Sequence, residues 1–208
     1  MSKRAGAVSA ETKECILRAA RQEFAARGFQ GSSLRRICAG AGVTTGALYF
    51  FFKGKDDLFE TVLSGVTRPF HAFMKAHYAS EQGFAEKTLG EGEQEDLEVT
   101  ALLIDLYFQN RQTWDIILAH QSHPAVRRFL EEFIQYSTDH YMGILTRAEQ
   151  MHPRRTRVDR FDLQQFMQMQ TDSILNLISQ DFTREEMVAH SKTVVKMLRG
   201  AFFALMQD

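Results

Sequence analysis

The 208-residue sequence predicts an all-α fold, an expectation that rests on three observations. Apolar side chains recur three and four residues apart through most of the chain, as they do on the buried face of an α-helix. No stretch keeps the alternation of apolar and polar residues that marks a half-buried β-strand. Prolines, which break helices, number only three, while 44% of the residues are hydrophobic and can build a substantial core.

Composition also excludes several classes of protein. No apolar stretch reaches the roughly 18–20 residues that a membrane-spanning helix needs, and the charged N-terminus lacks the apolar segment of a signal peptide. Cys15 and Cys38 are the two cysteines, too few for a disulfide framework. We therefore expect a soluble, reduced, cytoplasmic protein.

Residues 1–54 predict a small module of three helices. These helices are expected at Ser9–Arg27, Leu34–Ala41 and Thr45–Phe51. Gly28 is expected to end the first, a serine after Gly31 to cap the second, and Thr44 to cap the third. Gly42 supplies the positive φ that a tight turn between the second and third helices needs.

Residues 55–208 predict a larger helical body. Its helices are expected over residues 56–80, 97–119, 125–151, 161–179 and 183–206, with a break near Asn110. Pro69 is expected to bend or split the first of these helices, and Thr183 with Glu186 fits a capping box at the start of the last. Seven acids and three glycines in residues 80–98 predict an exposed loop, and residues 152–157 are expected to end the third helix.

Charge is distributed unevenly along the chain, although the net charge is −1. Residues 1–60 carry ten basic and six acidic side chains, a net +4. Residues 61–208 carry 15 basic and 20 acidic ones, a net −5. This asymmetry suggests that the N-terminal end faces a polyanion, although charges spread over solvated faces would give the same counts.

Two short helices joined by a tight turn in a basic module indicate a helix-turn-helix. In that motif the second helix enters the major groove of DNA while the first lies across it. The side chains expected to face inward are Leu34, Ile37 and Ala41 from the first helix, and Leu48 and Phe52 from the second. The outward side of the second helix begins with small residues, which let a helix approach base edges closely.

The segment from Ile37 to Leu58, ICAGAGVTTGALYFFFKGKDDL, closely resembles the DNA-binding signature of TetR-family transcriptional regulators. The first helix of the same pattern is matched by Ile16–Ala20, Phe24, Gly28 and Phe29. The resemblance covers residues 11–60. It implies a homodimeric repressor whose C-terminal body binds a small molecule and then releases DNA.

The resemblance also implies individual DNA contacts. The residues expected to make them are Ser33, Arg35, Arg36, Thr44, Thr45, Gly46, Tyr49, Phe50 and Lys55. Tyr49 and Lys55 would bind phosphates, which position the protein, whereas residues 44–46 would face bases. Phe51 departs from the family pattern, which often has a phosphate-binding His or Tyr there. Because the recognition helix lacks Arg, Lys, Asn and Gln, its readout would rest on threonine hydroxyls and on methyl contacts to thymine.

Other interpretations of the same residues stay open. The aromatic run at residues 49–52 also fits a buried core. Cys15 and Cys38 fit buried positions better than a redox switch, although the sequence does not decide between them. Lys3 and Arg4 fit either an arm on DNA or, more simply, a frayed tail.

The sequence predicts neither an enzyme nor a metal or cofactor site. Among the seven histidines only His120 and His123 are close together, and a zinc site needs several converging ligands. Glu149 and His152 match one of the two Glu-x-x-His units of a di-iron bundle, and the second unit is missing. No catalytic triad or glycine-rich phosphate loop stands out.

Aromatic side chains with polar ends predict an effector pocket in the body. Core packing is the simpler interpretation of any one of them, but this region resembles the one in which family members hold an apolar effector cavity. The expected pocket residues are Phe70, Phe73, Met74, His77, Leu103, Tyr107, Trp114, Phe133, Tyr136 and His140. An amphipathic or aromatic small molecule would suit them.

Surplus apolar surface on the last two helices predicts a homodimer with a two-fold four-helix interface. The expected interface residues are Phe166, Ile174, Leu177, Ile178, Val194, Leu198, Phe202 and Leu205. A core buried within one chain is the alternative. A dimer would place two recognition helices about 34–36 Å apart, matching successive major grooves of a pseudo-palindromic operator.

The leading hypothesis is therefore a ligand-responsive homodimeric repressor. One alternative is a DNA-binding regulator that a partner protein, not a small molecule, releases from DNA. Another is a helical enzyme or carrier with an appended DNA-binding module.

Overall fold

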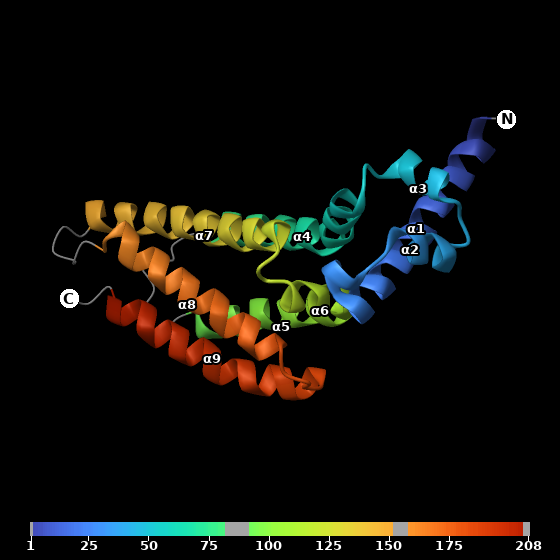
Figure 1. Ribbon diagram of the computed structural model, residues 1–208. Helices are drawn as coiled ribbons and strands as arrows, with labels where there is room; N and C mark the ends of the chain where they lie inside the picture. The colour runs from blue at the N-terminus through green and yellow to red at the C-terminus, as the bar shows by residue number, and fades with distance from the viewer. Residues whose placement is uncertain (1, 82–91, 152–157, 206–208) are drawn as a thin grey trace. The chain divides into compact units, whose positions relative to one another are not determined.

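The computed structural model describes residues 2–81, 92–151 and 158–205, and all the regular structure in these ranges is helical (Figure 1). The helices are α1 (Ser2–Gly31), α2 (Leu34–Ala41), α3 (Thr45–Phe51), α4 (Lys55–Ser80), α5 (Glu93–Gln109), α6 (Arg111–Ala119), α7 (Pro124–Met151), α8 (Arg160–Ile178) and α9 (Arg184–Leu205). The all-α prediction is confirmed. Within the described ranges, no helix is both long and apolar enough to cross a membrane.

The chain forms two compact units, each built from two stretches of sequence. Unit 1 comprises residues 1–69 and 110–127, and unit 2 comprises residues 70–109 and 128–208. Unit 1 is larger than the module expected at residues 1–54, because α6 packs against α1 and the Phe59 ring of α4 packs against Phe24 of α1. The start of α4 therefore belongs to the same compact unit as the helix-turn-helix.

The turn between α2 and α3 forms as the sequence predicts. Gly42 has a φ of +66° and ends α2. Thr44 caps α3, since its Oγ1 accepts the Ala47 N–H at 3.2 Å. Ser33 occupies the predicted cap position of α2, but its side chain makes no capping hydrogen bond, and its own N–H donates to Glu23 of α1.

Helix α1 differs from its expected bounds at both ends. It begins at Ser2, seven residues before the predicted start at Ser9. Gly28 has a non-helical φ of +67° and ψ of 173°, and the chain then resumes helical structure up to Gly31. The predicted end of the helix is therefore a kink at glycine, because only glycine adopts that backbone conformation without strain.

Helix α4 runs through Pro69 without a break, so the predicted split does not occur. A proline inside a helix removes one hydrogen bond and adds one steric clash. Val66 before it and Met74 after it are both buried. Burial of apolar side chains on both sides compensates for the local loss and keeps the helix continuous.

The acidic segment at residues 80–98, predicted as an exposed loop, differs from that prediction where the structure describes it. Residues 82–91 lie outside the described residues, as do residues 152–157, which were expected to end α7. Helix α5 begins at Glu93, so residues 93–98 are helical and the predicted loop is wrong there. Three acids in the first turn of α5 explain the difference, because negative charge is favourable at a helix N-terminus.

Unit 2 is a bundle in which α9 packs against both α5 and α8 (Figure 1). Its core joins three helices through Ile134, Leu163, Met167 and Phe202. The capping box predicted at the start of α9 is confirmed. The Thr183 N–H donates to Glu186 Oε2 at 2.8 Å, and the Glu186 N–H donates to Thr183 Oγ1 at 3.2 Å.

Candidate functional site

Helix α3 turns two aromatic side chains outward and keeps two apolar ones inside. Leu48 and Phe52 are buried, as predicted. Tyr49 and Phe50 are 57% and 79% exposed, so the interpretation of these two as core residues is wrong. Thr44, Thr45 and Gly46 are exposed on the same short helix and the turn before it. The outward side of α3 is therefore small at its start and aromatic at its end.

Two of the basic residues expected on DNA are already engaged within unit 1. Arg36 donates from Nε to Glu23 Oε1 at 2.6 Å, and its Nη2 donates to the Gly31 carbonyl. Lys55 donates to the carbonyls of Phe29 at 2.8 Å and Ser32 at 3.4 Å. Sequence reasoning missed both of these internal contacts, because they join residues far apart in the chain.

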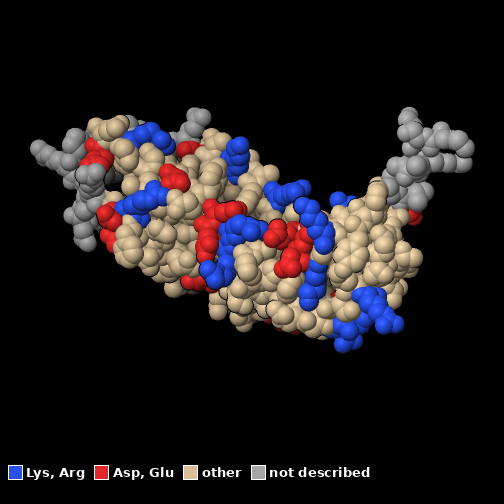
Figure 2. All heavy atoms as spheres, turned by 45° about the horizontal axis from the view of Figure 1, so that its top comes forward, with Lys and Arg blue, Asp and Glu red and all other residues tan. Residues whose placement is uncertain are grey.

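Charge on the molecular surface follows the asymmetry of the sequence in part. In Figure 2, Lys and Arg side chains border a largely uncharged area on the surface of unit 1. Arg35 is among the exposed basic residues of α2. Over unit 2 the same view shows both signs of charge interspersed. This arrangement suits DNA binding, because basic side chains contact the phosphates and position the protein while the uncharged face contacts the bases.

The end of α1 is fixed by side chains from two other helices of unit 1. The Phe29 N–H donates to His120 Nε2 at 2.8 Å, and Lys55 Nζ donates to the Phe29 carbonyl. His120 Nδ1 lies 2.7 Å from the Ile116 carbonyl, so this nitrogen carries the ring proton. His120, weighed from the sequence as a metal ligand, has both ring nitrogens in hydrogen bonds to the backbone.

We expect Gly28→Ala to destabilise the protein. The φ of +67° disfavours any L side chain, and a Cβ at this position would lie 3.2 Å from His120 Nε2. The expected loss is about 2 kcal/mol in the free energy of unfolding, measured by urea denaturation. Gly65→Ala is the matched control, because a Cβ there meets nothing within 4 Å. Equal stability of the two variants would contradict the prediction.

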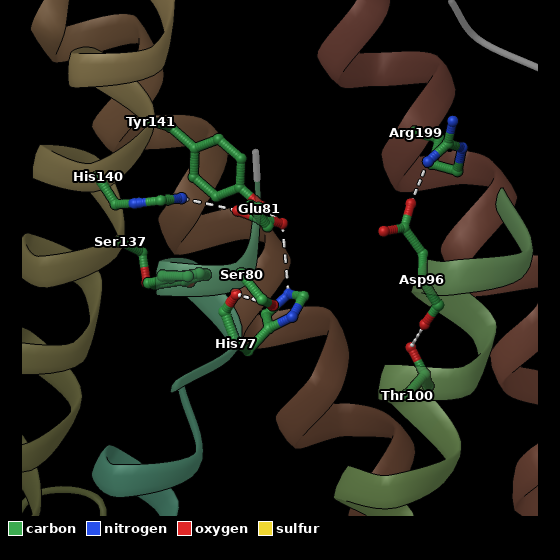
Figure 3. Close-up of polar contacts among 10 residues, drawn as sticks. His77, Ser80, Glu81, Asp96, Thr100, Ser137, His140, Tyr141 and Arg199 are labelled. Carbon is green, nitrogen blue, oxygen red and sulfur yellow. Dashed lines mark hydrogen bonds and ion pairs between the residues drawn. The ribbon is translucent and has the colours of Figure 1, made fainter. Parts of the chain in front are cut away.

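Unit 2 contains a buried carboxylate where the sequence predicts an exposed loop (Figure 3). Glu81 directly follows α4, and its side chain is only 9% exposed. Its Oε2 lies 2.7 Å from His140 Nε2, and its Oε1 lies 3.3 Å from both His77 Nε2 and the Tyr141 hydroxyl. Burial opposes ionisation, but the hydrogen bonds and positive charge of the two histidines lower the pKa of Glu81 to about 2.

Aromatic and ionic contacts extend this cluster. The Tyr78 ring stacks on His140 with centroids 4.2 Å apart and planes 6° from parallel, and its hydroxyl lies 2.8 Å from Ser137 Oγ. Burial is the main cause that raises the pKa of Tyr78 above its ordinary value. Asp96 of α5 pairs with the buried Arg199 of α9 (Figure 3). Unit 2 thus holds charged groups inside its bundle, each with an opposite charge or a hydrogen-bond partner.

The ten residues of the predicted pocket do not all lie in one unit. Nine belong to unit 2, whereas Trp114 belongs to unit 1. His77 and His140 meet at Glu81, and the rings of Phe70 and Phe133 are 5.0 Å apart. Met74 and Tyr107 are buried, Phe73 and Leu103 are partly buried, and Tyr136 is 43% exposed. The four-residue spacing of His77 and Glu81 is the sequence signal that indicates their contact.

The residues predicted at the dimer interface divide into two groups. Ile178 and Phe202 are buried within their own chain, so little of their surface is left for a partner. The other six are partly buried: Phe166, Ile174, Leu177, Val194, Leu198 and Leu205. Two methionines of this pair of helices are more exposed, Met169 at 46% and Met197 at 69%.

Comparisons with known proteins agree on one family. A family model described as bacterial regulatory proteins, tetR family, matches residues 16–62. The transcriptional repressor BepR of Brucella suis biovar 1 (strain 1330) is 45% identical over 67 residues, which are 32% of each chain. The chain therefore matches only about a third of that relative's length. The regulator SrpR of Pseudomonas putida is 23% identical over 100% of this chain and 91% of its own.

The fold is also shared with solved structures. The transcriptional regulator FadR of Bacillus subtilis, solved in complex with stearoyl-CoA, has a TM-score of 0.60 at 22% identity. The similarity covers 89% of this chain and 96% of that one. A regulator of Aquifex aeolicus VF5 has a TM-score of 0.61 at 18% identity, over 90% of this chain and 99% of its own. Residues 16–62 thus match the TetR family of bacterial regulatory proteins, and the chain shares its fold with solved transcriptional regulators.

Proposed function

We propose that the protein is a transcriptional repressor that binds a pseudo-palindromic operator and is released from it by a small molecule. The outward side of α3 carries the proposal, because it combines exposed small residues with exposed Tyr49 and Phe50. A helix of this kind fits a major groove, and the α2–α3 turn has the geometry of a helix-turn-helix. The name of the Brucella relative, a repressor, supports the direction of regulation.

The proposed binding species is a homodimer formed through α8 and α9. Exposed Met169 and Met197 support it, as do the six partly buried apolar residues of the same two helices. The N-terminal module has a small positive charge, so one copy would bind DNA weakly. Two linked copies gain affinity because the second contact becomes intramolecular.

The proposed effector is an amphipathic or aromatic molecule that binds unit 2. The buried aromatic and ionic groups around Glu81 support a ligand with both apolar and polar parts, and the FadR structure contains such a molecule, stearoyl-CoA. Helix α4 begins in unit 1 and ends beside Glu81 in unit 2. An effector that favours one position of α4 would shift the population of DNA-binding dimers.

We expect Tyr49→Phe to weaken operator binding about fivefold to a hundredfold, because each of the two copies loses one hydroxyl contact to a phosphate, about 0.5–1.5 kcal/mol each. Genomic fragments bound by the wild-type protein supply the operator, and fluorescence anisotropy measures the affinity. Tyr136→Phe is the matched control, since Tyr136 is also exposed but lies in unit 2. Sedimentation of the complex should give two copies for each operator. A wild-type protein that enriches no DNA sequence would refute the proposed function.

A further inference from the structure

We propose that Phe50 selects the operator sequence by an apolar contact with the 5-methyl group of thymine. This inference rests on the proposed function, since it needs α3 in the major groove. Apart from the exposed Thr45, the turn and helix offer little else for base recognition. Residues 44–52 contain no Arg, Lys, Asn, Gln, Asp or Glu, the side chains that recognise base edges by hydrogen bonds. The Thr44 hydroxyl is already engaged as the cap of α3.

Phe50 points outward, and its ring contacts one neighbouring aromatic ring. At 79% it is the most exposed large hydrophobic side chain in the described part of the protein. Its ring lies edge to face on the partly buried Phe51, with centroids 5.0 Å apart and planes 89° apart. Edge-to-face contact is a favourable geometry for a pair of aromatic rings. The protein therefore presents an exposed apolar surface to its surroundings.

Gly46 lies on the same face of α3 as Phe50. Gly46, Tyr49 and Phe50 share one side of the helix, because they are three and four residues apart. A Cβ on Gly46 would meet only Thr44 Oγ1, at an ordinary 3.9 Å. The fold itself therefore does not require glycine at this position. A glycine on the face that also carries Phe50 lets the helix backbone lie close to a partner.

Thymine carries the apolar group in the major groove that Phe50 can contact. The 5-methyl group of thymine is the apolar group that this groove presents, whereas cytosine has only a hydrogen at the same position. Burying one methyl group against a ring favours binding about fourfold. With one such contact in each half-site, the affinity for the operator would rise roughly sixteenfold. We therefore expect a T·A pair opposite Phe50 in both half-sites.

The test replaces single thymines of the selected operator and measures affinity for the full-length protein. Deoxyuridine, which lacks only the methyl group, should weaken wild-type binding about fourfold at one position of each half-site. A 5-methylcytosine·guanine pair at that position should bind more tightly than cytosine·guanine. Phe50→Ala should bind the thymine and deoxyuridine operators equally. Phe161→Ala is the control, since Phe161 is 65% exposed on α8, in unit 2.

Two results would overturn the assignment while leaving the proposed function intact. One is a specific operator that tolerates deoxyuridine at every thymine. The other is a deoxyuridine effect that persists unchanged in Phe50→Ala, which would assign the methyl contact to another residue. Failure of the wild-type protein to select any operator would overturn both this assignment and the proposed function. Circular dichroism of Phe50→Ala, whose side chain is exposed, checks that the fold is kept.

Discussion

Replacing Gly46 by alanine is expected to stabilise the protein and to weaken operator binding at the same time. Alanine in a helix restricts the unfolded chain more than glycine does, which favours folding by about 0.5–1 kcal/mol. The new Cβ has room in the free protein, where its nearest contact is 3.9 Å away. On DNA the same atom would hold α3 away from the base edges. We expect affinity to fall about tenfold, a loss of about 1.4 kcal/mol.

Thermal unfolding and anisotropy on the selected operator measure the two effects separately. Gly65→Ala is the matched control: Gly65 is exposed on α4 in the same unit, and a Cβ there meets nothing within 4 Å. It should stabilise the protein equally and leave DNA affinity unchanged. If Gly46→Ala bound the operator as tightly as Gly65→Ala does, the proposed docking face of α3 would be wrong.

Glu81→Gln is expected to destabilise the protein by about 2–3 kcal/mol at neutral pH. The carboxylate accepts from His140 and from the Tyr141 hydroxyl and lies beside His77, and its side chain is largely buried. Glutamine keeps one acceptor oxygen but introduces an amide donor where these neighbours also donate. Denaturant unfolding at pH 7 measures the loss.

The pH dependence of the same variant tests the cause. The pKa of Glu81 in the folded protein is about 2, below its ordinary 4.5, so the folded state favours the ionised form. Its contribution, about 3 kcal/mol, is complete above pH 4.5 and is lost as the pH falls towards 2. The difference between wild type and Glu81→Gln should therefore shrink over that range. Asp139→Asn is the control.

Asp139 makes a similar contact in a different environment. Its 2.6 Å ion pair with Arg160 is on the surface, with the two side chains 54% and 47% exposed. Surface pairs contribute about 0–1 kcal/mol because solvent screens them. A large effect of Asp139→Asn, equal to that of Glu81→Gln, would show that burial is not what makes Glu81 important.

Local signals in the sequence predicted most of the helical structure. Gly42, Thr44 and the Thr183–Glu186 pair act on backbone groups within four residues, so their roles follow from the sequence alone. The outward position of Tyr49 and Phe50 and the inward position of Leu48 follow from the spacing of apolar residues. The predicted split at Pro69 and the predicted loop at residues 93–98 were wrong, because apolar burial and the helix dipole favour helix there.

The sequence by itself determined the fold class, the helix-turn-helix and the face of α3 that points outward, because these depend on neighbours along the chain. Only the tertiary structure shows which charged and polar side chains contact one another or the backbone. Lys55 reaches the carbonyl of Phe29, His120 reaches the N–H of the same residue, and Glu81 lies between two histidines. These partners are separated by 26 to 91 residues in the sequence, except for the His77–Glu81 pair, which is four residues apart. Such contacts form only when packing buries these polar groups away from water. A buried polar group then needs a hydrogen-bond or ion-pair partner from elsewhere in the fold.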